Sequence, residues 1–383
     1  MAKDLSQVRE ELDRIDSQLA SLFTRRMDLA ADVIAAKSKT GKAVADPARE
    51  RQKLAGIARM VPDRFEPQAI SLFSLIMSMN RAEQKRIQAE SDPQAPSKLA
   101  RASFAPVDEA FPAVATVACQ GVEGAYSQIA ACRLFEVPQI TFFDGFGGVC
   151  RAVADGLCEF GVLPIENSTA GSVNAVYDLI AQHRVSIVRS LRQKIDHNLL
   201  ALPGTRLPQI REVISHNQAI SQCAGYLNRL GVSVTAVENT AKAAEIVASS
   251  GRDDLAALSS RSCSELYGLD ILEADVQDSD NNYTRFVVIA NGPKIYPGAD
   301  RSSILLTLKN EPGALYRVLE RIYALDINLV KLESRPIPGR DFEFMFYFDL
   351  DCPACSPSFA ALLDSLDDVC GRFHYFGSYS EVL

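Results

Sequence analysis

The sequence lacks several features that would direct its chemistry or its location. It contains no tryptophan and only four histidines among 383 residues, so we expect its chemistry to rest on other groups. No apolar run approaches the ~18 residues that a membrane span requires. The first residues, MAKDLSQVREELD, are charged and form no apolar signal region.

The nine cysteines are an odd number, and most stand singly within apolar segments. This usage is typical of reduced thiols in the cytosol rather than of a disulfide framework, so we expect a cytoplasmic protein. Cys352 and Cys355 form one CxxC pair, but no second pair and no nearby histidine complete a zinc site. We therefore expect neither a metal nor another cofactor.

Acidic residues exceed basic residues, and the net charge of −8 argues against nonspecific binding to nucleic acid. The charge is uneven along the chain. Residues 1–90 hold 16 Lys and Arg against 13 Asp and Glu, a balance of +3, so the remaining 293 residues carry −11. A slightly basic N-terminal region on an acidic protein predicts a small anionic ligand at that end.

Two breaks divide the chain into three regions. Residues 91–112 contain four prolines and little periodicity, as in a linker, and a shorter break, NGPKIYPGADR, covers 291–301. We expect a helical domain at 1–90, a second domain at 113–292 and a third at 300–383.

The first region begins with the spacing of a long helix. Arg26 interrupts an apolar seam, and Lys37 follows eleven residues later at nearly the same azimuth. A cation in an apolar seam is costly unless it is paired, so the two cations indicate a buried polar pocket. The seam itself alternates intervals of three and four residues, as in a coiled coil: Leu5, Val8, Leu12, Ile15, Leu19, Leu22, Leu29, Val33 and Ala36.

Two further stretches add polar groups to this region. The helix predicted at 67–88 places Asn80 and Gln84 one turn apart within its apolar stripe. The stretch DPARERQKL at 46–54 starts like a helix capped by Asp46, yet it brings Arg49 near the positive helix end. Either this is a solvated charged face, or it is one wall of an anion-binding site.

The other two regions combine strands and helices. Residues 302–383 read β-α-β-β-α-β, and alternate phenylalanines in FEFMFYFDL predict a half-buried strand. Residues 113–290 alternate strand-like and helix-like segments, which predicts an α/β fold with a largely parallel sheet. Its candidate strands include VATVAC, FGVLPI, SIVRSL, HNLLALP, EVISH, SVTAVE, LAALSS and TRFVVIA.

Motifs in the three regions resemble three known families. The first region resembles the all-helical chorismate mutases through VREELDRID, FTRRM, IAAK, DPARER and Gln84. The second resembles the prephenate dehydratases through GVEGAYSQ, VLPIENS, SHNQAISQC and NYTRF, and the third resembles ACT regulatory domains through NEPGAL and LESRPIPG. In this order they resemble the bifunctional P-proteins of phenylalanine synthesis. The resemblance implies an all-α domain, a two-lobed α/β domain like the type II periplasmic binding proteins, and an α+β ferredoxin-like domain.

For the first region, the resemblance implies an isomerase that rearranges chorismate to prephenate. This one-molecule reaction needs a compact substrate conformer and stabilisation of negative charge on the ether oxygen. Arg9 lies 17 residues before Arg26, about 260° around a helix, so we expect it to serve a partner chain's pocket. The resemblance implies chorismate binding by Arg9, Arg26, Lys37, Asp46, Arg49, Glu50, Asn80 and Gln84, with Lys37 and Gln84 as catalytic donors.

For the second region, the resemblance implies a lyase that removes CO2 and the ring hydroxyl from prephenate, with Thr284 as the catalytic hydroxyl. Asn217 stands where the family motif usually has proline. The residues alone leave open whether Arg285 binds a substrate carboxylate or a structural acid. The implied prephenate-binding residues are Glu166, Asn167, Ser215, Gln222, Glu238, Thr240, Thr284 and Arg285.

For the third region, the resemblance implies feedback inhibition by L-phenylalanine bound across a dimer interface. We therefore expect a homodimer or higher homo-oligomer that acts on small molecules, with neither nucleic acid nor membrane as a partner. Two other hypotheses stay open: a dehydratase whose helical domain only dimerises, and an amino-acid-binding regulator without catalysis. The implied effector residues are Asn310, Gly313, Ala314, Leu315, Glu333, Ser334 and Arg335.

Overall fold

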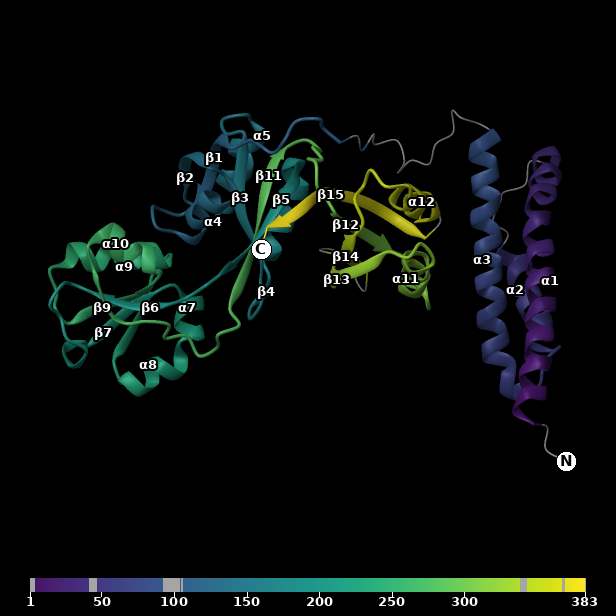
Figure 1. The fold of residues 1–383 in the computed structure, drawn as a ribbon, viewed down its shortest axis with the longest axis horizontal. Helices are drawn as coiled ribbons and strands as arrows, with labels where there is room; N and C mark the ends of the chain where they lie inside the picture. Colours follow the sequence, from purple (N-terminus) through teal and green to yellow (C-terminus); the bar gives the residue numbers. More distant parts are fainter. Residues whose placement is uncertain are drawn as a thin grey trace. The chain divides into compact units, whose positions relative to one another are not determined.

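The computed structural model describes residues 4–40, 47–91, 104, 106–337, 343–366 and 369–382 (Figure 1). The chain falls into two compact units, one formed by residues 1–103 with 361–368 and the other by residues 104–360 with 369–383. Within the described ranges, no helix is both long and apolar enough to cross a membrane.

The first unit is helical, as predicted. It consists of α1 (Leu5–Thr40), α2 (Pro47–Ala58), a short 3₁₀ turn (Asp63–Phe65) and α3 (Glu66–Ser91). Both α1 and α2 pack against α3 (Figure 1). The apolar seam of α1 is nevertheless left uncovered, because Leu5, Leu12 and Leu22 are each more than half exposed.

The second unit contains a ten-stranded sheet in the order β13-β14-β12-β15-β5-β11-β3-β1-β2, with β4 (Gly171–Ser172) paired to β3. We call residues 113–194 and 283–291 the first lobe. Its strands are β1 (Val114–Gln120), β2 (Val137–Phe143), β3 (Phe160–Asn167), β5 (Val185–Lys194) and β11 (Tyr283–Asn291), and its helices are α4 (Tyr126–Leu134), α5 (Phe146–Ala154) and α6 (Asn174–His183). Helix α4 covers one face of this part of the sheet, and α5 and α6 cover the other.

The second lobe, residues 198–273, has its own five-stranded sheet in the order β10-β6-β9-β7-β8. Helices α9 and α10 pack on one face of this sheet, and α7 and α8 pack on the other (Figure 1). The strands are β6 (Asn198–Ala201), β7 (Glu212–Ser215), β8 (Ser233–Ala236), β9 (Leu255–Ser259) and β10 (Asp270–Glu273). The helices are α7 (Asn217–Gln222), α8 (Ala224–Leu230), α9 (Thr240–Ser250) and α10 (Arg261–Tyr267), and a 3₁₀ turn (Leu207–Gln209) lies between β6 and β7.

The two lobes are joined by two crossover segments, residues 195–197 and 274–282. The segments are hydrogen-bonded to each other, because Ile195 N–H donates to Asn282 O and Val276 N–H donates to His197 O, both at 2.8 Å. The returning strand β11 runs antiparallel to β3 and to β5. The prediction of a largely parallel sheet is therefore right for β2-β1-β3 and β8-β7-β9. It is wrong for β11, where the chain re-enters the first lobe in the opposite direction, and for β6 and β10, which pair antiparallel in the second lobe.

The C-terminal region has the predicted β-α-β-β-α-β order. Its elements are β12 (Arg301–Leu308), α11 (Ala314–Ala324), β13 (Asn328–Pro336), β14 (Phe344–Asp351), α12 (Pro357–Leu366) and β15 (Cys370–Val382). Strands β13, β14, β12 and β15 pair antiparallel, and the end of β15 continues in parallel pairing along β5. The prediction that this strand is half-buried is wrong for the second half of β14. Both Tyr347 and Phe348 are buried, because the Tyr347 face packs on the first lobe with its ring centroid 4.8 Å from that of Tyr177.

Candidate active sites

In the helical unit, polar groups predicted on two helices meet. Arg26 Nη1 of α1 donates to Ile76 O of α3 at 3.2 Å, and Asn80 Nδ2 donates to Arg26 O at 3.3 Å. Gln84 Nε2 donates to Asn80 Oδ1 at 2.7 Å, and Gln84 is 5% exposed. Burial lowers the pKa of Arg26. The structure therefore brings Arg26, Asn80 and Gln84 together in a partly buried polar cluster.

Glu50 joins the same helices through a partner that the sequence analysis missed. Its carboxylate pairs with Arg81 of α3. The signal for Arg81 was helical spacing, since it lies four residues after the buried Met77 and three before the buried Gln84. The contact fixes Glu50 of α2 against α3.

Two other predicted residues of this unit, Arg9 and Arg49, lie at its surface. Arg49 is exposed and donates to Gln52 Oε1 of its own helix at 2.9 Å. Arg9 is exposed on α1. Asp46 and the side chain of Lys37 lie outside the described residues.

In the second unit, Asn167 and Thr284 are direct neighbours on β3 and β11. Asn167 Oδ1 accepts from the backbone N–H groups of Thr169 (3.1 Å) and Ala170 (3.0 Å), which fixes the orientation of the amide. Asn167 Nδ2 then donates to Thr284 Oγ1 at 3.0 Å and to Asn282 Oδ1 at 2.9 Å. Because Thr284 Oγ1 is the acceptor of this bond, its own hydroxyl hydrogen is left for another acceptor.

Gln222, the last residue of α7, reaches this cluster from the second lobe. Its Nε2 donates to Thr169 Oγ1 at 2.8 Å, and its Oε1 accepts from Asn282 Nδ2 at 3.1 Å. The same Oε1 lies 2.9 Å from His197 Nε2. Both lobes and both crossover segments therefore contribute to one hydrogen-bond network, which we call the crossover network: Asn167, Thr169, His197, Gln222, Asn282 and Thr284.

Glu166 and Arg285 turn away from the crossover network. Glu166 directly precedes Asn167 on β3, and Arg285 directly follows Thr284 on β11. Because successive residues of a strand point to opposite faces, both side chains lie on the face opposite the network. Arg285 Nη2 contacts Asp349 Oδ2 of β14 at 2.6 Å and Glu166 Oε2 at 3.2 Å. Glu166 Oε1 also contacts Lys331 Nζ of β13 at 3.2 Å. These contacts place the Arg285 guanidinium against the carboxylates of Asp349 and Glu166.

The other predicted residues of the second lobe lie near the carboxyl ends of its parallel strands. Ser215 ends β7, is fully buried and donates to Leu258 O at 2.7 Å. Glu238 is exposed after β8, and Thr240 begins α9. Asn239 caps this helix by accepting from Lys242 N–H at 2.7 Å. In sheets of this kind, the carboxyl ends of parallel strands border the ligand crevice.

Three members of the crossover network were missed from the sequence. Asn282 is the first residue of the motif NYTRF, and Thr169 directly follows the motif VLPIENS, so the edges of these motifs carried the only signal. His197 begins the apolar segment HNLLALP, where a histidine resembles an ordinary core residue.

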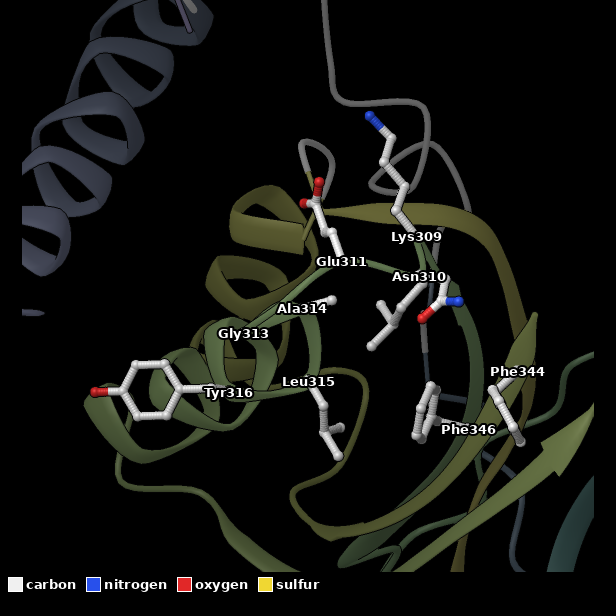
Figure 2. Close-up of a pocket in the computed structure, with 10 residues that line it drawn as sticks. Lys309, Asn310, Glu311, Gly313, Ala314, Leu315, Tyr316, Phe344 and Phe346 are labelled. Atoms are coloured by element: carbon white, nitrogen blue, oxygen red, sulfur yellow. The ribbon is translucent and has the colours of Figure 1, made fainter. Parts of the chain in front are cut away.

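The C-terminal region contains a cavity of about 260 Å³ (Figure 2). The predicted effector residues Asn310, Gly313, Ala314 and Leu315 all contribute to it. Figure 2 shows the two phenylalanines of β14 across from the turn that carries Asn310, whereas Tyr316 points away from them. The complete lining is Leu308, Lys309, Asn310, Glu311, Gly313, Ala314, Leu315, Tyr316, Phe344 and Phe346.

The predicted effector residues of β13 are divided between two faces. Ser334 pairs in register with Phe346 and therefore shares its face. Glu333 and Arg335 point to the opposite face, where Glu333 accepts from Ser172 of β4. Arg335 Nη2 contacts Asp178 Oδ2 of α6 at 3.0 Å. These two side chains thus join the C-terminal region to the first lobe.

All nine cysteines are free thiols. Over the part of the chain that the structure describes, no three His, Cys, Asp or Glu side chains are grouped as a metal site.

Two family models match consecutive parts of the chain. The model described as chorismate mutase type II matches residues 8–85, and the model described as prephenate dehydratase matches residues 117–294. These ranges contain the Arg26–Asn80–Gln84 cluster and the crossover network, respectively.

Individual relatives agree with the two models. An Arabidopsis thaliana protein named arogenate dehydratase/prephenate dehydratase 1, chloroplastic, is 36% identical over 69% of this chain and 71% of its own length. A solved Arthrobacter aurescens prephenate dehydratase in complex with L-Phe is 25% identical, with a TM-score of 0.63 over 69% of this chain and 89% of that chain. A bifunctional chorismate mutase/prephenate dehydratase from Aquifex aeolicus is 30% identical over 100% of this chain and 99% of its own length. The chain belongs to the family of bifunctional chorismate mutase/prephenate dehydratases.

Proposed function

We propose that this chain catalyses two consecutive reactions of phenylalanine synthesis and is inhibited by the end product. The helical unit rearranges chorismate to prephenate, and the two lobes convert prephenate to phenylpyruvate. The observation that carries the proposal is the crossover network, which holds the Thr284 hydroxyl between two lobes within the range matched by the dehydratase model.

The mutase chemistry requires cations for two carboxylates and donors for one ether oxygen. Arg26 supplies a partly buried cation, and Gln84 supplies a buried amide beside it. An amide nitrogen carries two hydrogens, so Gln84 Nε2, which donates one to Asn80 Oδ1, can donate the second to the ether oxygen. Lys37 is the second proposed donor, and the other proposed contacts are Asp46, Arg49, Glu50 and Asn80. Arg81 holds Glu50 in place.

A second copy of the chain completes the mutase pocket in this proposal. The seam of α1 has the spacing of a helix–helix interface, yet its leucines are exposed within one chain. Arg9 also lies exposed on this helix, at an azimuth far from that of Arg26. A homodimer that buries the seam would bring Arg9 to the partner's pocket.

The dehydratase step breaks two bonds of prephenate. The electrons of the bond to the departing carboxylate enter the ring, the ring becomes aromatic, and the ring hydroxyl leaves. The products are phenylpyruvate, CO2 and hydroxide, so the enzyme must stabilise charge on the departing oxygen. Thr284 can donate its free hydroxyl hydrogen to that oxygen. The N–H of Asn167 that donates to Thr284 Oγ1 polarises the hydroxyl and strengthens it as a donor.

The other dehydratase residues divide into two groups. We propose that Gln222, Ser215, Glu238 and Thr240 form the second-lobe side of the prephenate site, since they lie near the carboxyl ends of its parallel strands. Glu166 and Arg285 act indirectly, because their ion pairs join β3 and β11 to the C-terminal region.

We propose that residues 300–383 are a ferredoxin-like ACT domain that binds L-phenylalanine. The β-α-β-β-α-β order, the complex of the Arthrobacter relative with L-Phe and the cavity beside α11 support this assignment. Gly313, with a φ of 78°, starts α11 and exposes its first N–H groups, which favour a carboxylate. Leu315, Phe344 and Phe346 give the cavity an apolar side. The proposed domain bounds are 1–90 and 113–292, joined by a linker at 91–112, and 300–383, in a cytoplasmic homo-oligomer.

The test compares two substitutions of Thr284 in the full chain. Thr284→Val removes the hydroxyl at similar shape, and Thr284→Ser keeps it. We expect Thr284→Val to lose dehydratase activity by on the order of 10²–10³-fold, as for loss of one donor to a developing oxyanion. Thr284→Ser should retain much more, and both should consume chorismate at the parental rate.

Chorismate is followed by its absorbance, and phenylpyruvate is detected in alkali. A parent that forms phenylpyruvate from prephenate but does not consume chorismate would support the degenerate-mutase alternative. A parent that does neither, yet binds phenylalanine, would support the non-catalytic regulator. Equal activity of Thr284→Val and the parent would refute the role of Thr284.

A further inference from the structure

His197 is a buried titratable residue that has no part in the dehydration step proposed for Thr284. It is 2% exposed and occupies the first crossover segment. Its backbone is fixed from the second crossover segment, since its N–H donates to Gln277 Oε1 and its carbonyl accepts from Val276 N–H, both at 2.8 Å. The ring therefore has a defined position at the junction of the two lobes.

The ring makes one hydrogen bond, from Nε2 to Gln222 Oε1 at 2.9 Å. An amide oxygen can only accept, so Nε2 carries the hydrogen. His197 Nδ1 is buried and has no hydrogen-bond partner within the described residues, which disfavours a proton on that nitrogen. Burial also lowers the pKa of His197. The neutral form with hydrogen on Nε2 is thus the form that fits this site.

Two donors, one from each crossover segment, determine which way the Gln222 amide faces. Both His197 Nε2 and Asn282 Nδ2 donate to Gln222 Oε1. The amide nitrogen must then face Thr169 Oγ1, which lies 2.8 Å away. Thr169 accepts there because its own hydroxyl donates to Asn167 Oδ1 at 2.6 Å. Turning the amide by half a rotation would oppose N–H groups to N–H groups.

We propose that His197 is a positioning residue for the dehydration, which sets the orientation of the Gln222 amide where this side chain reaches the Thr284 site from the second lobe. The inference rests on the proposed function of the two lobes. His197 donates to Gln222 Oε1, and the Gln222 amide nitrogen then lies closest to Thr169 Oγ1, with Asn282 Oδ1 at 3.3 Å and Asn167 Oδ1 at 3.4 Å. Backbone N–H groups fix the Asn167 amide that donates to Thr284, so a correctly turned Gln222 amide links the second lobe to this fixed part of the site.

Two amide substitutions of His197 separate this role from simple packing. The amide nitrogen of His197→Gln can occupy the position of Nε2, whereas the shorter side chain of His197→Asn ends near Nδ1 and cannot reach Gln222. We expect His197→Asn to lower the kcat for prephenate by on the order of 10²-fold, with a smaller change in KM, because the Gln222 amide beside the reacting hydroxyl is misplaced. His197→Gln should stay within about tenfold of the parent, since it restores a hydrogen bond worth ~1 kcal/mol.

The chorismate mutase activity of each sample serves as an internal control for concentration and integrity, and thermal unfolding checks the second unit. Equal losses of kcat in folded His197→Gln and His197→Asn would overturn the proposal, as would parental kcat in His197→Asn. If His197→Asn does not fold, His197→Phe, which keeps a ring but has no donor, is measured alone and combined with Gln222→Ala. The positioning role predicts that His197→Phe lowers kcat on its own but adds almost no further loss to Gln222→Ala, and an additive loss would overturn it. A parent without dehydratase activity would instead refute the proposed function on which this role rests.

Discussion

Replacing Asp349 with alanine should strongly destabilise the second unit, because it leaves a buried cation without its main partner. Arg285 is 8% exposed and Asp349 is 2% exposed, and their closest atoms are 2.6 Å apart. Burial alone disfavours the charge, but the neighbouring Tyr379 and Asp349 raise the pKa of Arg285 above its ordinary value. A guanidinium is effectively never deprotonated in a protein, so Arg285 stays charged when Asp349 is removed.

Breaking a buried ion pair from one side typically costs ~3–5 kcal/mol. Glu166 remains 3.2 Å from the guanidinium but is about one-third exposed, with a side-chain exposure of 34%, so it offsets only part of the loss. Asp349 Oδ1 also accepts from Ser303 Oγ at 2.5 Å, and losing a hydrogen bond of this kind adds ~1 kcal/mol. We expect a total of about 3–4 kcal/mol, which corresponds to a fall in Tm of roughly 6–16 °C for a unit of this size.

Calorimetry of the full chain measures this fall, and Asp178→Ala is the matched control. Asp178 also joins the C-terminal region to the first lobe, through Arg335, but its side chain is 56% exposed. Arg335 is 16% exposed, but solvent around Asp178 screens the pair, which should contribute only ~1 kcal/mol, so its loss should change the Tm much less. The double substitution Arg285→Met with Asp349→Leu removes both charges and should recover most of the stability. A fall in Tm for Asp349→Ala no larger than that for Asp178→Ala would refute the reasoning.

Three further predictions concern pH and assembly. Because burial lowers the pKa of His197, the unfolded chain binds a proton that the folded chain does not, so the stability of the second unit should fall as pH drops below about 6.5. This dependence should be shallower in His197→Gln, and identical unfolding curves of parent and variant from pH 5 to 8 would contradict it. Gln84→Glu can donate only when protonated, so its mutase activity should persist in acid and fall by on the order of 10²–10³-fold as pH rises; a flat pH profile would place Gln84 outside the site. Mixed Arg9→Ala and Arg26→Ala chains should recover mutase activity in hybrid dimers, and verified heterodimers without activity would exclude shared pockets.

The helical unit could be read largely from its sequence. Arg26, Asn80 and Gln84 were expected to meet because both helices keep one period over their whole length, and the hydrogen bonds among them confirm the expectation. Arg81 shares that period but was overlooked, since a charged residue near a helix surface resembles a solvated one. Its pairing with Glu50 depends on how α2 packs on α3, which local spacing does not encode.

The lobes were less predictable in detail, because side-chain direction there depends on contacts between distant segments. Glu166 and Asn167 are adjacent in one motif, yet the strand pleat sends them to opposite faces. Which of these faces borders the site depends on strands β13 and β14, more than 150 residues later in the chain. His197 was missed for a similar reason, since its partner Gln222 becomes its neighbour only when the chain crosses between the lobes.

The continuous pairing of β15 with β5 also limits how the protein can be cut into pieces. Residues 380–382 pair with Arg189–Leu191, so strand β5 is an interior strand only while the C-terminal strand is present. Gly377 permits the close crossing at this point, because a Cβ there would lie 2.0 Å from Ile187 O. A truncated chain that ends near residue 300 would leave β5 as an open edge with unpaired backbone groups, a surface prone to self-association. Residues 291–301 therefore mark a break in the sequence pattern, but cutting the chain there would remove a strand that the sheet needs.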